Sequence, residues 1–348
     1  MSRKIHASLL ALLMLTAFAL AGGKAASTAA ASPAASSDLL SALPPSDFIF
    51  YVDSQRVLND VIPTIFADQP EARARLESDL DQAQKELGFD PRTIEATATG
   101  FNFPASRQSR GYDFAIILRG RFDANAIIDG GFANAIKRSK GELEKRTRQY
   151  EGRTIYVLAQ TARPATEGGK SEEVEREPSG NTMVFVALDS NTVALGNLKS
   201  VQATIDASMG RAKVDDELVQ LAMRSPGAVV SFSGNVTQEL ANSFHIGNKE
   251  ANNSLSSIRQ IYGSFNLSGS DGEAFVNLRT ETAEQASHLG TIMNGLKLMA
   301  RLGRARNADE QKSLETLINT LNIYAVGNEV QINLKVTAKD LLPIVRTF

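Results

Sequence analysis

The chain alternates between two spacings of apolar residues, one typical of strands and the other typical of helices. Runs in which apolar and polar residues alternate predict strands, whereas apolar residues three or four positions apart predict helices. In the first half of the chain, the strand pattern occurs at 48–52, 94–103, 112–122, 148–158, 183–188 and 192–195. The helix pattern occurs at 57–66, 76–87, 124–136 and 199–207.

The second half of the chain repeats this order of elements. Strands are predicted at 228–233, 261–267, 274–280 and in a hairpin over 323–336, and helices at 236–244, 283–302 and 339–345. The segments that begin at Arg119 and at Arg279 both lead from a strand into a helix. We therefore predict an α+β fold of two similar halves, residues 43–210 and 211–348. Each half is expected to be an antiparallel sheet with helices packed mainly on one face.

Single glycines and polar residues mark where the predicted elements begin and end. Gly88 follows the last apolar residue of a predicted helix and is expected to end it. Asp123 and Asn197 precede two further helices and are expected to cap their N-termini. The hairpin near the C-terminus is predicted to turn at Gly327-Asn328-Glu329. Residues 161–181, rich in Pro, Gly and Glu, are predicted to form an exposed loop.

The first 26 residues have the layout of a secretory signal peptide, because basic residues precede the apolar run Leu9–Ala21 and small residues follow it. This run is shorter than the about 20 residues that a membrane-spanning helix needs. We therefore expect cleavage after Ala21 or after Ala25, with no transmembrane span afterwards. Residues 27–38 are small and mostly polar, and the segment 27–42 is predicted to form a flexible tether. The protein is expected to be exported, either to the periplasm or out of the cell.

The amino-acid composition excludes some kinds of chemistry and disfavours some kinds of binding partner. The sequence contains no cysteine, which excludes disulfides, thiolate metal ligands, cysteine nucleophiles and a lipid anchor on a mature N-terminal cysteine. The net charge is −2, and removal of the basic leader makes the mature chain more acidic. Nucleic acid binds basic surfaces, so we expect no nucleic-acid partner. Tryptophan is absent and only three histidines occur, which disfavours carbohydrate stacking and histidine catalysis.

No catalytic, cofactor-binding or metal-binding motif occurs in the sequence. The Gly-x-Ser-x-Gly and Ser-x-x-Lys patterns of serine enzymes are absent, as are the phosphate-binding loop and the Rossmann glycine fingerprint. His245 and His288 have no second histidine at metal-binding spacing. The Asp189-Ser-Asn191 segment is interpreted as a tight turn, and Asp215-Asp216 as the start of a helix. We therefore assign no catalytic residue, no cofactor and no metal.

Three further groups of residues receive structural interpretations. The basic run from Lys137 to Arg148 is interrupted by Glu142 and Glu144 and is interpreted as a solvated loop. Apolar residues of the long C-terminal helix are expected in the core, or in a ligand pocket between the sheet and the helices: Met293, Leu296, Leu298 and Met299. Six strand aromatics are expected to point inward: Tyr51, Phe114, Tyr156, Phe232, Tyr262 and Phe265.

Three phrases carry a resemblance to other proteins. They are Leu43-Pro-Pro-Ser-Asp-Phe-Ile-Phe-Tyr-Val-Asp53, Ser257-Ile-Arg-Gln-Ile-Tyr-Gly-Ser-Phe265 and Thr282-Ala-Glu-Gln-Ala286. With the layout of residues 43–345, they resemble uncharacterised exported bacterial proteins of a domain-of-unknown-function family. The resemblance implies a location in the cell envelope and assigns no functional residue.

These observations favour a non-enzymatic exported protein that binds or scaffolds through a surface between its two halves. Its partner is expected to be an envelope protein or a hydrophobic ligand. One alternative is a carrier of a lipid or another hydrophobic ligand. Another alternative is a hydrolase that uses two carboxylates, as many glycosidases do.

Overall fold

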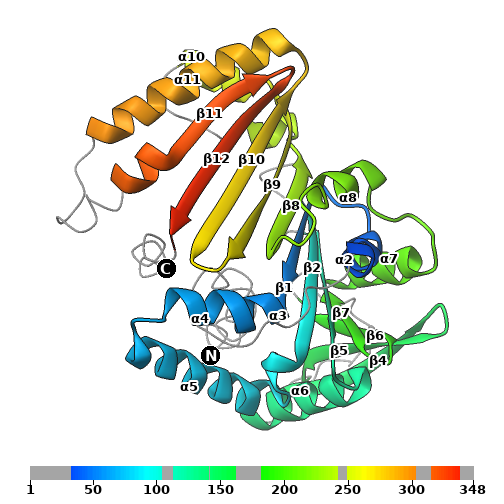
Figure 1. The fold of residues 1–348 in the computed structure, drawn as a ribbon. Coiled ribbons are helices and arrows are strands. Elements are labelled where there is room, and N and C mark those ends of the chain that lie inside the picture. Colours follow the sequence, from blue (N-terminus) through cyan, green and yellow to red (C-terminus); the bar gives the residue numbers. More distant parts are fainter. Residues whose placement is uncertain are drawn as a thin grey trace, which may run out of the picture.

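The computed structural model describes residues 33–103, 113–140, 142–161, 182–241, 249–302 and 315–337. These residues build an α+β fold, as predicted, around one antiparallel sheet of twelve strands (Figure 1). Neighbouring strands follow the order β11-β12-β10-β9-β8-β1-β2-β3-β7-β6-β5-β4. Their bounds are β1 Phe48–Asp53, β2 Ile94–Asn102, β3 Asp113–Gly120, β4 Leu143–Tyr150, β5 Arg153–Gln160, β6 Val184–Asp189, β7 Thr192–Gly196, β8 Val230–Asn235, β9 Ile258–Ser268, β10 Asp271–Thr280, β11 Leu321–Val326 and β12 Glu329–Thr337.

The helices connect the strands and range from single turns to the 20 residues of α11. None of the helices that the structure describes is long and apolar enough to cross a membrane. The segment from residue 54 to 65 is helical throughout but changes type, with a π-helical turn, η2, in its middle. The bounds are α2 Pro33–Ser41, α3 Ser54–Arg56, η2 Val57–Val61, α4 Ile62–Ile65, α5 Pro70–Leu87, the 3₁₀ turn η3 Pro91–Thr93, α6 Ala124–Arg138, α7 Leu198–Ser208, α8 Asp216–Ala222, α9 Gln238–Ala241, α10 Lys249–Leu255, α11 Ala283–Leu302 and a last turn at 315–320.

Successive residues of β1 point to opposite faces of the sheet. We call the two faces the Tyr51 face and the Phe50 face. On the Tyr51 face, helices α2, α7 and α8 pack against β1, β2, β3 and β5–β7. Leu40 of α2, Ile117 of β3 and Leu218 of α8 are fully buried in this core.

Helices also cover the Phe50 face, whereas the sequence predicted helices mainly on one face. Helix α6 packs over β6 and β7 through Phe132, and α11 packs over β10–β12 through Leu289 (Figure 1). The physical reason lies in strands such as β3, where Ala115–Leu118 is a continuous buried apolar run. Such a run presents apolar side chains to both faces, so each face must be covered.

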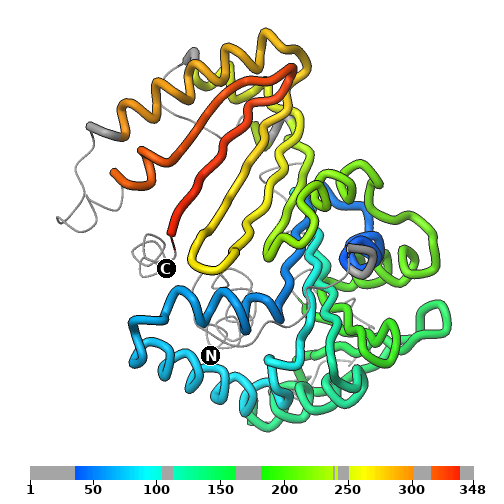
Figure 2. Tube along the Cα trace, viewed as in Figure 1, coloured from blue at the N-terminus to red at the C-terminus, as the bar shows by residue number. Residues whose placement is uncertain are grey.

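The two predicted halves contribute adjoining sections to one sheet rather than building two sheets. Strands β1 and β8, far apart in the sequence, lie side by side and pair in antiparallel fashion, with Phe50 opposite Phe232 (Figure 2). We call this pairing the β1–β8 junction. Because β1 starts the first section and β8 starts the second, the sheet extends outward from the junction in both directions.

Matched strand pairings occur on the two sides of the junction. In β2 and β3, Ile94 pairs with Gly120 and Ala96 with Arg119, so the register shifts by one residue. The same shift occurs in β9 and β10, where Ile258 pairs with Thr280 and Gln260 with Arg279. Backbone bonds match as well: Gly120 N donates to Asn191 O at 3.1 Å, and Thr280 N donates to Asn328 O at 2.9 Å. Duplication itself stays a prediction, which these pairings favour.

The predicted element ends are confirmed. The Asp123 carboxylate accepts from Ala126 N at 2.8 Å, and the Asn197 side chain accepts from Ser200 N at 2.8 Å, so both cap helices. Gly88 ends α5 with a φ of 81°, a conformation that glycine adopts without strain. A Cβ at Gly88 would also collide with the backbone of Gly130, so two glycines let α5 and α6 approach closely.

Three segments differ from their sequence-based predictions. The single strand predicted at 148–158 is divided by the turn at Glu151 and Gly152, so its residues belong to two paired strands, β4 and β5. Residues 33–41, placed in the flexible tether, form helix α2, because Leu39 and Leu40 are both buried against the Tyr51 face. The basic run, interpreted as a solvated loop, instead continues into edge strand β4, which forms a hairpin with β5 through Glu151 and Gly152. Cross-strand backbone pairing compensates for the polar sequence of β4, since its side chains can remain in water.

Several predictions lie outside the described residues. These are the signal peptide at 1–26 with its cleavage sites, the first part of the tether, the loop at 162–181, His245 and the closing helix at 339–345.

Strands β4 and β11 end the sheet among the strands that the structure describes. Strand β4 has the sequence LEKRTRQY, in which charged residues alternate with polar ones. Strand β11 has the uncharged sequence LNIYAV. Side chains of α11 bind its carbonyls: Asn294 Nδ2 donates to Ile323 O at 3.2 Å, and Lys297 Nζ donates to Leu321 O.

Candidate functional site

Five phenylalanine rings meet on the Phe50 face at the β1–β8 junction, and we call them the central aromatic patch. The patch consists of Phe48 and Phe50 of β1, Phe101 of β2, Phe103 directly after β2, and Phe232 of β8. The ring of Phe50 stacks on Phe101 at 5.8 Å and on Phe232 at 5.7 Å, and Phe48 stacks on Phe101 at 5.5 Å. Phe103 meets Phe48 and Phe101 edge to face, at 5.4 and 5.2 Å.

Two glycines shape the patch. Gly234 lies opposite Phe48, and Gly263 lies opposite Phe232. A Cβ at Gly234 would overlap the Phe48 ring, and a Cβ at Gly263 would crowd the Phe232 ring. The two rings therefore lean over the neighbouring strands, with Phe48 over β8 and Phe232 over β9.

The patch differs from an ordinary core. Phe50, Phe101, Phe103 and Phe232 are each partly exposed, while Phe48 is buried. All five rings lie outside the five apolar cores that the described residues form. Strand pairing thus brings the rings together, and none of them holds a described helix against the sheet.

The helical segment from α3 to α4 borders the patch. Its residues Val57 and Val61 pack with Val52, which continues the apolar row of β1. Arg56 ties this segment to the second section of the sheet, because its guanidinium donates to Asn266 Oδ1 at 3.1 Å and to Leu267 O at 3.0 Å. The wall beside the patch is therefore held by polar bonds as well as by apolar packing.

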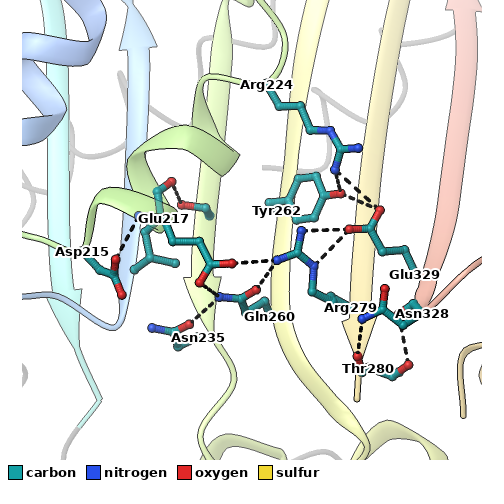
Figure 3. A network of polar contacts seen from close by, with 12 residues as sticks. Asp215, Glu217, Arg224, Asn235, Gln260, Tyr262, Arg279, Thr280, Asn328 and Glu329 are labelled. Atoms are coloured by element: carbon teal, nitrogen blue, oxygen red, sulfur yellow. Dashed lines mark hydrogen bonds and ion pairs between the residues drawn. The ribbon is translucent and has the colours of Figure 1, made fainter. Parts of the chain in front are cut away.

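The Tyr51 face of the second section carries a polar network (Figure 3). Arg279 of β10 donates to Glu329 of β12 at 3.0 Å and to Glu217 of α8 at 2.9 Å. Tyr262 of β9 donates to Glu329 Oε2 at 2.8 Å and accepts from Arg224 Nη1. The guanidinium groups of Arg224 and Arg279 also lie 5.3 and 5.6 Å from the Tyr262 ring centre.

The geometry of this network indicates a structural role. Burial raises the pKa of Tyr262 to about 12, and the hydrogen bond to Glu329 acts in the same direction, so the phenol stays protonated. Glu217 and Glu329 are the acidic residues that the network brings together, and both are bound to Arg279. A carboxylate acid and base need a cleft in which substrate and water reach them. Glu217 and Glu329, which are both held by Arg279, are not arranged as the acid and base in a cleft that the hydrolase alternative requires.

The structure also brings together a serine and a histidine that the sequence did not connect. Ser254 Oγ, on α10, lies 2.9 Å from His288 Nδ1, on α11. The contact joins α10 to α11 near the C-terminal end of α10.

The four apolar residues of the C-terminal helix that were expected in the core or in a pocket do not all lie there. Leu298 and Met299 of α11 are 61% and 59% exposed. Met293 packs against the core between α11 and the sheet, and Leu296 is half-buried. Leu298 and Met299 face away from the core because a rotation of about 100° per residue places both of them more than about 100° around the helix from Met293.

The six aromatics expected to point inward divide between the two faces. Tyr51, Tyr262 and Phe265 are buried, whereas the other three are half-buried: Phe114, Tyr156 and Phe232. Tyr51 and Tyr262 lie on the Tyr51 face, and Phe232 joins the central aromatic patch. No pattern in the sequence indicates a patch at Phe48, Phe50, Phe101 and Phe103, because strand pairing alone brings these residues together.

The remaining polar predictions are structural. Asp215 caps α8 by accepting from Glu217 N at 2.9 Å, and Asp189 accepts from Asn191 N at 2.9 Å in the turn between β6 and β7, as predicted. Within the described ranges, no group of three His, Cys, Asp or Glu residues could hold a metal ion.

No family model matches the sequence, and no curated protein matches it. Among solved structures, the chain is similar to TP0453 in three crystal forms, each with a TM-score of 0.42. Crystal form III is 9% identical over 89% of this chain and 98% of that chain, form I is 11% identical over 89% and 96%, and form IV is 10% identical over 90% and 98%. A likeness this distant carries no argument about function.

Proposed function

We propose that this chain is an exported, non-enzymatic protein that binds an apolar ligand, such as an acyl chain, on the central aromatic patch. The observation that carries the proposal is the grouping of five phenylalanine rings at the β1–β8 junction, outside the described cores. The proposed site lies where the two predicted halves meet, and its occupant is the hydrophobic ligand of the carrier alternative. An exported protein also agrees with the resemblance to uncharacterised exported bacterial proteins.

The chemistry of the patch supports an apolar ligand. All five side chains are hydrocarbon, and the residues beside them on the same face, Val52 and Val230, are also apolar. Burial of apolar surface stabilises binding by about 25 cal/mol for each Å² removed from water. Ligand pockets are commonly lined by apolar and aromatic side chains. An acyl chain fits this surface because it needs no polar partner along its length.

A fluorescent fatty acid tests the proposal. The mature chain contains no tryptophan, so the emission of parinaric acid can be followed against a low protein background. We expect saturable binding, and we expect the double variant Phe101→Ser/Phe232→Ser to weaken it by about tenfold or more, since each lost ring contact removes roughly 1 kcal/mol or more. Circular dichroism would establish that the variant remains folded.

The matched control is the double variant Leu298→Ser/Met299→Ser, which removes two exposed apolar side chains from α11. We expect this control to bind the probe as the wild-type chain does. Binding that survives the patch variant but is lost in the α11 variant would place the ligand on the helix and overturn the proposal. The absence of saturable binding to the wild-type chain would also overturn it.

Native mass spectrometry tests export and the natural ligand together. The protein would be purified from the envelope fraction of its own cells and its mass compared with that of the chain cleaved after Ala21 or Ala25. A cleaved chain with a retained apolar molecule is the expected result. A chain that keeps residues 1–26 in the cytoplasm would contradict export.

A further inference from the structure

On the opposite face of the sheet from the aromatic patch, a small polar cavity lies beside the β1–β8 junction. Its volume is about 10 Å³, and its walls come from α2, β1, β8 and the segment between α8 and β8. Five of the lining residues carry polar side chains: Ser36, Tyr51, Asp53, Ser225 and Ser231. The cavity therefore joins N-terminal helix α2 to strands from both predicted halves.

Tyr51 is the residue that makes this cavity unusual. Its side chain is only 3% exposed, and burial raises the pKa of its phenol to about 12. Among the described buried side chains, the Tyr51 hydroxyl is the one polar atom without a hydrogen bond of ordinary geometry within the protein, although the neighbouring Ser36 side chain lies close enough to lower its pKa slightly. A buried hydroxyl without a partner costs about 1–3 kcal/mol, so folded proteins almost always satisfy such groups.

We propose that the cavity is a hydration site that binds one water molecule, which hydrogen-bonds to the Tyr51 hydroxyl. The size fits, because a cavity of about 10–15 Å³ holds a single water. The chemistry also fits, because a buried water needs two to four polar partners. The serine hydroxyls and the Asp53 carboxylate that line the cavity can supply the partners besides Tyr51.

This site does not depend on the proposed apolar ligand. The hydrogen bonds of this water link helix α2 to the β1–β8 junction, in addition to the direct contacts between them. The site would be present in the chain with or without a ligand on the Phe50 face.

A high-resolution crystal structure of the mature chain is the first test. We expect electron density for one water at a hydrogen-bonding distance of about 2.7–2.8 Å from Tyr51 Oη. A cavity without density would overturn the proposal. So would a direct hydrogen bond between Tyr51 and Ser36 that closes the cavity.

The stability of Tyr51→Phe is the second test, and it distinguishes a hydrated phenol from an unpaired one. If the water is bound, the variant loses a hydrogen bond, and the unfolding equilibrium constant should rise about three- to tenfold. An unpaired phenol predicts an unchanged or smaller unfolding constant, because the substitution then removes an unsatisfied group. The control is Tyr156→Phe, a half-buried tyrosine that packs against Phe132 and should leave the constant unchanged.

Discussion

Arg279 and Glu329 bind side by side on neighbouring strands, with Nε and Nη2 of the arginine each 3.0 Å from the same Oε1 of the glutamate. Glu329 is 8% exposed as a residue, and the pair lies directly across the β10–β12 pairing. The same two strands carry a second pair, Glu273 and Lys335, whose side chains are 62% and 76% exposed. The two pairs thus differ mainly in their contact with water.

The first prediction compares these two pairs. Arg279→Ala should lower the free energy of unfolding by about 2–3 kcal/mol, because it leaves Glu329 charged and largely buried without its main partner. Lys335→Ala should leave it almost unchanged, because an exposed ion pair contributes little to stability. Urea denaturation of both variants measures the difference. Equal losses would contradict the structural role of the network.

The second prediction concerns a glycine under the aromatic patch. Gly234→Ala should destabilise the fold by about 1–3 kcal/mol, because the new Cβ overlaps the ring of Phe48 and displaces it. Gly295→Ala is the matched control, since nothing lies within 4 Å of its Cβ position in α11. Alanine there should stabilise the helix by about 0.5–1 kcal/mol. Thermal unfolding checks both signs, and a Gly234→Ala variant as stable as the wild-type chain would refute the ring placement.

The third prediction concerns helix α2. Leu40 is fully buried against the Tyr51 face, so Leu40→Ala should cost about 2–5 kcal/mol. Asp38, one residue before Leu39 and Leu40, is exposed, and Asp38→Ala should change stability by less than about 0.5 kcal/mol. A flexible tether at 33–41 predicts no loss for either variant. Denaturant unfolding therefore decides between the helix and the tether.

The fourth prediction concerns alkaline pH. The folded chain holds the phenol protons of Tyr51 and Tyr262 up to about pH 12, because burial raises both pKa values. Unfolded tyrosine loses its proton near pH 10. Between these values the unfolded state binds fewer protons, so stability should fall as pH rises from about 10 to 12 and should be unaffected by these groups below pH 10.

Spectrophotometric titration of tyrosinate, combined with unfolding at each pH, measures this effect. The double variant Tyr51→Phe/Tyr262→Phe should lose stability less steeply over the same range. A variant with the same slope as the wild-type chain would show that other groups cause the loss.

Much of the fold follows from local signals in the sequence. Asp123, Asn197 and Gly88 act within one turn of their own helix, and the hairpin at Gly327 and Asn328 needs only its flanking strands. Such signals can be recognised without knowing the rest of the fold. The α+β class follows for the same reason.

The errors arise where distant parts of the chain determine the outcome. Helix α2 has a weak local pattern and forms because Leu39 and Leu40 pack against strands that occur later in the sequence. Edge strand β4 has no apolar alternation and forms by pairing with β5. Helices on both faces follow from the buried runs of β3 and β7 once these strands lie inside the sheet.

The candidate site could not be predicted for a related reason. Phe50, Phe101 and Phe232 are separated by long stretches of sequence, and each resembles an ordinary strand residue. The pairings β1–β2 and β1–β8 bring their rings together. The polar network depends likewise on residues of α8, β9, β10 and β12 that meet only in the folded chain.

The two ends of the sheet have a consequence for how copies of the protein behave at high concentration. A free strand edge is a template on which another chain can add, and repeated addition leads to fibres. Here charge protects one end through β4, and the side chains of Asn294 and Lys297 occupy carbonyls of β11 at the other. Loss of the Asn294 and Lys297 side chains would therefore free these carbonyls to pair with a strand of another chain, without any change in the core.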